Sequence, residues 1–247
     1  MAGNALRMAR IATSAGSIVM VPLDHGVSMG PVPGLADPRL ALRAAAAGGA
    51  TCVTLHKGLV PHAASVAGRL GVLLHLSAST DRAPDPDDKR LVATVEEALR
   101  LGCDGVSIHV NVGSATEARQ VEDAGRVATA CNDWGVPLVA MVYPRGPKVK
   151  DPRDPVLVAH AARLGAELGA DAVKVPYTGS ADSFRAVVHG CPVPVLVAGG
   201  QARDAAAVLQ EMRDAQRAGA RGCSVGRNVF QAPDPEAALR AIAGVFR

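Results

Sequence analysis

Eight short apolar runs rich in β-branched residues recur along the chain, and their regular spacing limits the fold more than any other feature. The stretches between them are rich in Ala and carry spaced charges, as in Leu91–Leu101 and Pro155–Leu168, which is the pattern of helices. Near-continuous apolar strands are typical of parallel sheets covered on both faces. The sequence therefore predicts an α/β fold of eight strand–helix units. The predicted strands are Ile18–Leu23, Cys52–Leu55, Val72–Leu76, Gly105–Val110, Pro137–Val142, Ala172–Val175, Val195–Ala198 and Gly222–Val225.

Eight such units favour a closed (β/α)8 barrel, a TIM barrel, over an open sheet. The 247 residues of the chain match the roughly 250 residues typical of this barrel, so we expect one barrel domain over residues 1–247. The alternative is a Rossmann-type doubly wound sheet. It is disfavoured because Leu23 leads directly into Asp24, without a G-x-G-x-x-G motif after the first strand.

Composition argues against several classes of function. The net charge of +3 is spread along the chain and aromatic residues make up only 2%, which disfavours a nucleic-acid partner. No uncharged apolar run approaches the ~20 residues of a membrane span. The cysteines are an odd set without a C-x-x-C pair, so neither a zinc site nor disulfides are expected. We expect a cytoplasmic protein that needs no metal or other cofactor. The cysteines are Cys52, Cys103, Cys131, Cys191 and Cys223.

Polar residues and glycines follow the predicted strands where the strands end. In a (β/α)8 barrel the active site lies at the carboxyl ends of the strands, so these residues are the candidates for chemistry. They are Asp24-His25-Gly26-Val27-Ser28 after the first strand, His56-Lys57-Gly58 after the second, Tyr143-Pro144-Arg145-Gly146 after the fifth, Lys174 in the sixth, Ala198-Gly199-Gly200 at the seventh and Gly226-Arg227-Asn228 after the eighth.

Lys174 is the candidate nucleophile, because it stands in an apolar strand where an unpaired ammonium is costly. Burial favours the neutral amine, and only a neutral amine attacks a carbonyl carbon. Lys174 is therefore the candidate for a Schiff base. The pattern alone favours a structural lysine that reaches the strand end or pairs with a carboxylate, and the other residues at the strand ends shift the prediction to the Schiff base. Lys57 is a second candidate, for which pairing with a substrate phosphate or with a carboxylate of the first strand is favoured.

Two further side chains could move the protons that Schiff-base chemistry requires. Asp24 ends the first strand and Tyr143 ends the fifth, so in a barrel both would face the same cavity mouth as Lys174. Asp24 could instead be an N-cap, and Tyr143 an amphipathic residue of the rim. His25 and His56 are predicted to orient or contact substrate, because neither has a partner at the spacing of a metal site.

The loops after the seventh and eighth strands predict a phosphate site. Many barrels bind phosphate at these two loops, and glycines allow backbone N–H groups to approach an anion. Gly199 and Gly200 lie in one loop, and Gly226 and Arg227 in the other, where the guanidinium would add positive charge. A Gly-Gly pair is also common in plain turns. We expect a phosphorylated, sugar-like substrate.

The chain resembles, along nearly its whole length, the archaeal-type class I aldolases, a family related to class I fructose-bisphosphate aldolase. The resemblance implies Lys174 as the Schiff-base residue, Tyr143 as proton donor and Asp24 as its acid/base partner. It also implies substrate contacts from His25 to Ser28, at Pro144 and Arg145, and in the two glycine loops, and a homo-oligomeric ring, pentameric or decameric. The resemblance is carried by Val21-Pro22-Leu23-Asp24-His25-Gly26-Val27-Ser28, Leu55-His56-Lys57-Gly58, Val106-Ser107-Ile108-His109-Val110-Asn111-Val112-Gly113, Tyr143-Pro144-Arg145-Gly146 and Gly226-Arg227-Asn228.

The resemblance further implies a reaction. A ketone-derived enamine from a phosphorylated keto-sugar attacks L-aspartate 4-semialdehyde and gives 2-amino-3,7-dideoxy-D-threo-hept-6-ulosonate, which feeds an alternative route to dehydroquinate and the aromatic amino acids. Two alternatives stay open. One is condensation of dihydroxyacetone phosphate with aspartate semialdehyde toward an aminohydroxybenzoate of secondary metabolism, and the other is a plain class I fructose-bisphosphate aldolase.

The sequence departs from the family pattern at Val175-Pro176, next to the candidate lysine, and at Gln201-Ala202, in the predicted phosphate loop. These changes bear on the identity of the substrate more than on the type of reaction. Two other classes of function remain to be weighed against an aldolase. One is a barrel that binds a phosphorylated ligand without catalysis, and the other is a lyase or isomerase that uses acid–base chemistry without an imine.

Overall fold

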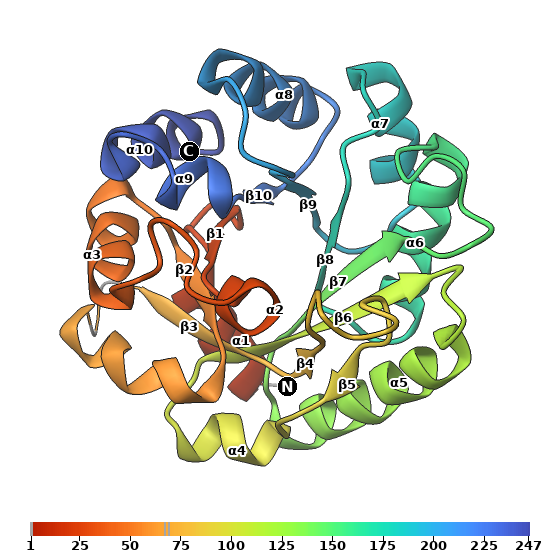
Figure 1. The fold of residues 1–247 in the computed structure, drawn as a ribbon, viewed down its shortest axis with the longest axis horizontal. Helices are drawn as coiled ribbons and strands as arrows, with labels where there is room; N and C mark the ends of the chain where they lie inside the picture. The colour runs from red at the N-terminus through yellow and green to blue at the C-terminus, as the bar shows by residue number, and fades with distance from the viewer. Residues whose placement is uncertain (1, 67, 69) are drawn as a thin grey trace.

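A computed structural model describes residues 2–66, 68 and 70–247. Eight parallel strands close into a barrel in the order β1-β10-β9-β8-β7-β6-β3-β2, and helices surround it (Figure 1). The predicted (β/α)8 barrel is confirmed. The Rossmann alternative is wrong, because β1 pairs with both β2 and β10 and leaves the sheet without an edge. The barrel strands are β1 Ile18–Pro22, β2 Cys52–Leu55, β3 Gly71–His75, β6 Gly105–Val112, β7 Leu138–Pro144, β8 Ala172–Val175, β9 Val195–Ala198 and β10 Gly222–Ser224.

The helices follow the strands in the alternating order that the sequence predicts. Four of the longer helices begin with an Asp whose side chain accepts hydrogen bonds from the first turn, at positions 37, 154, 204 and 234. The helices are α1 Ala2–Ile11, α2 His25–Met29, α3 Pro38–Gly48, α4 Val95–Arg100, α5 Glu117–Trp134, α6 Pro155–Glu167, α7 Ala181–His189, α8 Ala205–Arg217, α9 Arg227–Phe230 and α10 Pro235–Val245, with the 3₁₀ helix η1 at Lys57–Val66.

The core has two apolar layers, because successive side chains of a strand point to opposite faces of the sheet. The outer layer lies between the strands and the helices, and in β8 it includes Val173 and Val175. The inner layer fills the barrel and includes Ala172 of the same strand. α1 contributes Ile11 to this inner layer, against Gly71 at the start of β3. The inner-layer residues are Ile11, Ile18, Met20, Cys52, Leu73, Val139, Met141, Ala172 and Leu196.

Three local features differ from the sequence-based expectation. β7 extends to Pro144, so Tyr143 lies within the strand and pairs with Asn111 of β6. The connection after β2 is a 3₁₀ helix that contains Pro61, a residue without an N–H donor for an α-helix. The helix predicted over Leu91–Leu101 begins only at Val95, since Thr94 caps it through its Oγ1, 3.2 Å from Glu97 N.

Leu91 belongs instead to a small antiparallel hairpin formed by β4 (Ser77–Ala78) and β5 (Arg90–Leu91). The hairpin and α2 lie in front of the barrel centre in Figure 1, at the end where the strands finish. Both elements therefore border the mouth of the barrel. In the part of the chain that the structure describes, no helix is long and apolar enough to cross a membrane. All five cysteine thiols are buried and free.

Candidate active site

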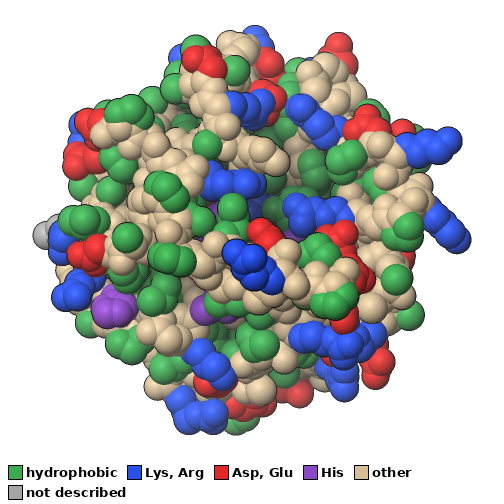
Figure 2. Space-filling model, viewed as in Figure 1, with side chains coloured by type: hydrophobic (Ala, Val, Ile, Leu, Met, Phe, Trp, Pro, Cys, Tyr) green, Lys and Arg blue, Asp and Glu red, His purple; other side chains and the backbone are tan. Residues whose placement is uncertain are grey.

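A cavity of about 500 Å³ opens at the carboxyl ends of the strands. Figure 2 shows Lys and Arg side chains gathered around the hollow in the middle of this face. The cavity receives residues from most of the barrel strands and from the β4–β5 connection. Its lining consists of Pro22, Asp24, His25, Ser28, Met29, Asp81, Lys89, His109, Met141, Tyr143, Arg145, Lys174, Ala198, Gly199, Gly200, Gln201, Ser224, Gly226 and Arg227.

Lys174 rises from inside the barrel into this cavity. It stands two residues after Ala172 of the inner layer, so the alternation of β8 directs it inward. The residue is only 8% exposed. Its Nζ lies 3.9 Å from Met141 Sδ and 5.8 Å from the centre of the Tyr143 ring. Among the described residues no carboxylate lies within ion-pair distance of this Nζ, so the structural lysine paired with a carboxylate is not what the fold contains.

Asp24 occupies the N-cap of α2, but its side chain makes no capping hydrogen bond. Its carboxylate lies 3.7 Å from His25 Nδ1 and 3.7 Å from His75 Nε2. Burial raises the pKa of Asp24, but the protonated forms of His75, His25 and Lys174, present at the low pH where Asp24 titrates, outweigh this effect and hold the pKa well below its ordinary value. The carboxylate is therefore ionised. Its Oδ1 is buried and has no hydrogen-bond partner within the described residues, which leaves it free to accept a bond from a substrate.

Neutral imidazoles flank Asp24. Burial lowers the pKa of His75 to about 4, although the nearby carboxylate opposes this shift. His75 Nδ1 lies 2.8 Å from Ser107 Oγ. If Ser107 donates to Nδ1, the proton of His75 is on Nε2 and faces Asp24. His56 stacks edge-on against His75 at 5.3 Å, and burial lowers its pKa too.

Tyr143 lies between charged groups and an imidazole. Its ring is 4.9 Å from that of His109, and Arg145 Cζ is 4.7 Å from the ring centre. Asn111 Nδ2 donates to Asp87 O at 2.9 Å, so Asn111 Oδ1 accepts from His109 Nε2 at 2.8 Å. Burial keeps the pKa of His109 well below its ordinary value. His109 is thus a neutral imidazole with its proton on Nε2.

Asn228 joins the two glycine loops into one unit. Its Nδ2 donates to Gly199 O and to Gln201 O, both at 2.9 Å. Gly226 allows close packing here, because a Cβ would lie 2.7 Å from His25 Cε1. Beside these loops, Arg227 Nε is buried and lacks a hydrogen-bond partner within the described ranges. The loops and the guanidinium thus offer anion-binding groups on one side of the cavity.

Most predicted site residues meet in this cavity, but five lie elsewhere. Gly26, Val27, His56 and Lys57 line a neighbouring pocket of about 630 Å³ that also reaches Asp24. Pro144 is buried at the end of β7.

Lys57 pairs with a carboxylate of a helix. Its Nζ lies 3.2 Å from Glu97 Oε1 of α4, so the first-strand carboxylate, one of the two partners expected for it, is wrong. The side chain of Lys57 extends outward and is half exposed, where it reaches the helix after β5 instead of Asp24.

Four ionisable residues in or beside the cavity were not predicted as site residues from the sequence: His75, His109, Lys89 and Asp81. His75 and His109 each lie between two outer-layer residues of their strands, as His75 does between Leu74 and Leu76, so both face inward, and this period was a usable signal. Lys89 and Asp81 lie in the connection between β4 and β5. β4 and β5 pair through only two residues each, which leaves no recognisable sequence pattern. The position of Lys89 and Asp81 at the cavity therefore could not be predicted from the sequence.

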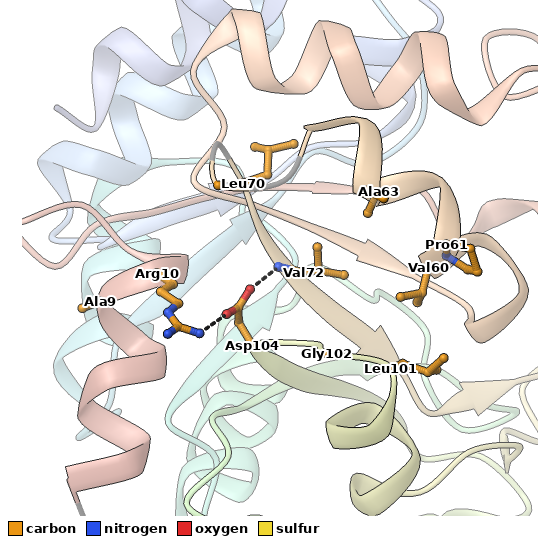
Figure 3. A pocket seen from close by; sticks show the side chains of 12 residues that line it. Ala9, Arg10, Val60, Pro61, Ala63, Leu70, Val72, Leu101, Gly102 and Asp104 are labelled. Atoms are coloured by element: carbon orange, nitrogen blue, oxygen red, sulfur yellow. Dashed lines mark hydrogen bonds and ion pairs between the residues drawn. The ribbon is translucent and has the colours of Figure 1, made fainter.

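A larger pocket of about 770 Å³ lies outside the barrel, between α1, η1 and the start of β3. Figure 3 shows Asp104 there, bonded to Arg10 Nη1 at 3.1 Å and to Val72 N at 3.0 Å. These bonds tie α1 to the amino end of the barrel. The pocket is lined mainly by apolar side chains and lies at the end opposite Lys174.

Comparisons with known proteins identify the family of this chain. Residues 18–232 match the family model described as DeoC/LacD family aldolase. The chain is 47% identical over 222 residues to a 2-amino-4,5-dihydroxy-6-oxo-7-(phosphonooxy)heptanoate synthase of Streptomyces griseus, covering 89% of this chain and 81% of the relative. It is 43% identical to a 2-amino-3,7-dideoxy-D-threo-hept-6-ulosonate synthase of Halobacterium salinarum, covering 99% of this chain and 91% of the relative. A solved structure of a Schiff base-forming fructose-1,6-bisphosphate aldolase superposes with a TM-score of 0.92 at 32% identity, covering 99% of this chain and 100% of that chain.

Proposed function

This chain belongs to the DeoC/LacD family of aldolases and is a class I aldolase, and from that premise we propose which substrates it joins and which residues act. The proposed reaction transfers a ketone-derived enamine from a phosphorylated keto-sugar to L-aspartate 4-semialdehyde. The product is 2-amino-3,7-dideoxy-D-threo-hept-6-ulosonate, which would enter aromatic amino acid biosynthesis. One observation carries the assignment of roles to residues. Lys174 faces inward, has no carboxylate within ion-pair distance among the described residues, and shares one cavity with Asp24 and Tyr143.

In the proposed mechanism, Lys174 Nζ attacks the donor ketone and forms a carbinolamine. Loss of water gives the imine, and departure of the leaving fragment, or of a proton, from the adjacent carbon gives the enamine. The enamine carbon then attacks the aldehyde carbon of the acceptor, whose oxygen takes a proton. Water finally releases the product ketone and regenerates the amine. Tyr143 is the proposed proton donor, and ionised Asp24 is the proposed proton acceptor.

The names of two relatives differ in the donor that they imply. A seven-carbon 2-amino acid with a phosphonooxy group on its last carbon is the sum of aspartate semialdehyde and a three-carbon phosphorylated ketone. Condensation with dihydroxyacetone phosphate is therefore the second candidate. It is favoured by the 47% identity and by the anion-binding groups on the β9 and β10 side of the cavity, where the donor phosphate would bind.

The test is incubation with aspartate semialdehyde and each phosphorylated ketone in turn, with the mass of the product as readout. We expect a seven-carbon amino product. The product carries no phosphate if the donor is the keto-sugar, and it carries a phosphate if the donor is dihydroxyacetone phosphate. Cleavage of fructose 1,6-bisphosphate without any use of aspartate semialdehyde would instead establish the plain aldolase. We also propose that the protein forms a homo-oligomeric ring of five or ten copies, which light scattering tests directly.

A further inference from the structure

The cavity has two chemically different sides, with Lys174 between them. β8 carries Lys174 and lies between β9 and β7 in the barrel. The glycine loops and Arg227 follow β9 and β10 on one side. Arg145 follows β7, and Lys89 and Asp81 belong to the connection after β3, on the other side. A donor whose phosphate binds at the glycine loops would therefore leave the second side open to the acceptor.

Two cations, Lys89 and Arg145, line that second side, and of the two only Arg145 has a carboxylate within 4.0 Å among the described residues. Lys89 Nζ donates to Ser79 Oγ, and among the described residues no carboxylate lies within 4.0 Å of it. Burial and then Arg145 lower the pKa of Lys89, a sign that the two cations face a shared, partly desolvated space. Arg145 is 45% exposed, and its nearest carboxylate oxygen, on Asp87, is 3.9 Å away. Both side chains thus keep hydrogen-bond donors for an anion.

The hairpin that carries Lys89 is fixed to the barrel wall. Asp87 O accepts from Asn111 Nδ2 at 2.9 Å and from Gln120 Nε2 at 2.8 Å. Lys89 O accepts from Arg119 Nη1 at 2.9 Å. Because these contacts come from β6 and α5, the position of the Lys89 backbone is set by the barrel itself, as a recognition site requires.

A carboxylate also lies at this side. Asp81 lines the cavity, its backbone N donates to Ser28 O at 3.0 Å, and its charge acts on Lys89. A phosphate dianion would gain from the two cations but would be repelled by Asp81. A zwitterion, with its carboxylate toward the cations and its ammonium toward Asp81, satisfies all three groups.

We propose that Lys89, Arg145 and Asp81 form the acceptor subsite, in which Lys89 and Arg145 bind the α-carboxylate of an amino-acid aldehyde and Asp81 binds its ammonium group. The proposal rests on the function proposed above and names the residues that select the acceptor. It makes Lys89 a specificity residue, separate from the proton transfers at Lys174.

The experiment removes one side chain of the enzyme and one group of the acceptor, separately and together, and compares the effects on kcat/KM. Wild type and Lys89→Met are assayed with L-aspartate 4-semialdehyde and with 3-aminopropanal, which lacks only the carboxylate. The Lys89→Met substitution keeps the length of the side chain and removes its charge. We expect kcat/KM for aspartate semialdehyde to fall roughly 10- to 100-fold, as for loss of a hydrogen bond to a charged group. The value for 3-aminopropanal changes less than about threefold, because that aldehyde has no carboxylate for Lys89 to bind. Lys89→Arg restores part of the loss.

Asp81→Asn is tested in the same way against succinic semialdehyde, which lacks only the ammonium group. We expect wild type to prefer aspartate semialdehyde over succinic semialdehyde, and Asp81→Asn to lose most of that preference. The loss arises on the aspartate semialdehyde side, because succinic semialdehyde has no group for Asp81 to bind.

Arg90→Ala is the matched control, since Arg90 is the next residue of the same hairpin but extends into solvent and pairs with Asp88 at 2.9 Å. This substitution should leave kcat/KM for aspartate semialdehyde and for 3-aminopropanal unchanged. Retention of the borohydride-trapped donor adduct in Lys89→Met shows that the donor side is intact.

The outcomes separate the two proposals. Unchanged kcat/KM for aspartate semialdehyde in Lys89→Met, or an equal loss with both acceptors, overturns the acceptor subsite and leaves the proposed function standing. A loss confined to cleavage of fructose 1,6-bisphosphate would identify the cations as a second phosphate site and likewise overturn it. Failure of wild type to use aspartate semialdehyde at all overturns the function and the subsite together.

Discussion

Lys174, Asp24 and Tyr143 occupy one cavity but have different electrostatic surroundings. Asp24 is ionised beside neutral imidazoles, Lys174 faces apolar and aromatic atoms, and Tyr143 contacts Arg145 and His109. A carboxylate that stays charged beside neutral histidines can accept a proton, and no cationic imidazole competes with the substrate to supply one. This arrangement suits proton transfer at a carbonyl held on the lysine.

Removal of the Tyr143 hydroxyl tests its role as proton donor. In Tyr143→Phe we expect kcat to fall by roughly 10²- to 10⁴-fold, the usual contribution of a positioned acid. Tyr177→Phe is the control, because the Tyr177 hydroxyl is buried, lacks a hydrogen-bond partner within the described residues and lies outside the cavity. Equal turnover of the two variants would show that Tyr143 is a rim residue only.

His75 makes stability depend on pH. Its pKa is about 4 in the folded chain, below the value of 6.5 for an unperturbed histidine, so the unfolded chain binds more protons between these values. The contribution of His75 is fully present above pH 6.5 and is lost as the pH falls toward 4. Between pH 7 and pH 5 this amounts to about 2 kcal/mol. The free energy of unfolding in urea should therefore fall less between pH 7 and pH 5 for His75→Gln than for wild type, by about 2 kcal/mol. If the two proteins lose the same free energy of unfolding over this range, the assignment is refuted.

At this scale the sequence predicted which chemically reactive groups belong to the site better than it predicted the histidines. Asp24 and Tyr143 were predicted because each directly follows an apolar run, and Lys174 because an ammonium is unexpected inside one. His75 and His109 were missed because they lie inside runs, where only the alternation of the strand shows that they face inward. The first-strand carboxylate expected as one partner of Lys57 was wrong, since the direction of this side chain after β2 is set by the 3₁₀ helix that follows.

Among the elements, α6 is the one that packs behind the lysine strand. Gly165 of α6 lies so close to β8 that a Cβ would meet Val173 Cγ1 at 2.8 Å. Val173 precedes Lys174, so the distance between this helix and this strand bears directly on the position of the amine. A side chain at position 165 would push the two elements apart.

Gly165→Ala should therefore destabilise the protein by about 1–3 kcal/mol, the usual cost of overpacking. Gly125→Ala in α5 is the matched control. Position 125 has no atom within 4 Å of an added Cβ, so the substitution should stabilise by up to about 1 kcal/mol through helix propensity. Both values come from denaturant unfolding. A Gly165→Ala variant as stable as Gly125→Ala would contradict the close packing of α6 on β8.

The barrel strands were predictable because each is a continuous apolar run between glycine, proline or polar residues. The hairpin of β4 and β5 was not, since two paired residues on each side give no periodic pattern and the predicted helix overran Leu91. This small element supplies Lys89 and Asp81, so the part of the site that would choose the acceptor was the part hidden from sequence reasoning.

For the whole molecule, closure of the sheet brings together residues that are far apart in the sequence. Asp24 and Arg227 stand near opposite ends of the chain and line the same cavity, because β1 pairs with β10. The fold was predictable from the count and spacing of the strands. The shape of the cavity was not, because it depends on the hairpin and on α2 as they lie over the barrel mouth.

Reductive trapping tests the Schiff base on Lys174 most directly. The protein is incubated with dihydroxyacetone phosphate and sodium borohydride, digested, and its peptides are weighed by mass spectrometry. Imine formation releases one water and borohydride reduction adds two hydrogen atoms. The mass of the peptide that contains Lys174 should therefore increase by the mass of the donor minus the mass of one oxygen atom. Lys174→Met should gain nothing, and the peptides that contain Lys57 and Lys89 should stay unmodified. Unmodified Lys174 in a preparation that still condenses dihydroxyacetone phosphate with an aldehyde, or an adduct on a different lysine, would contradict the proposed mechanism.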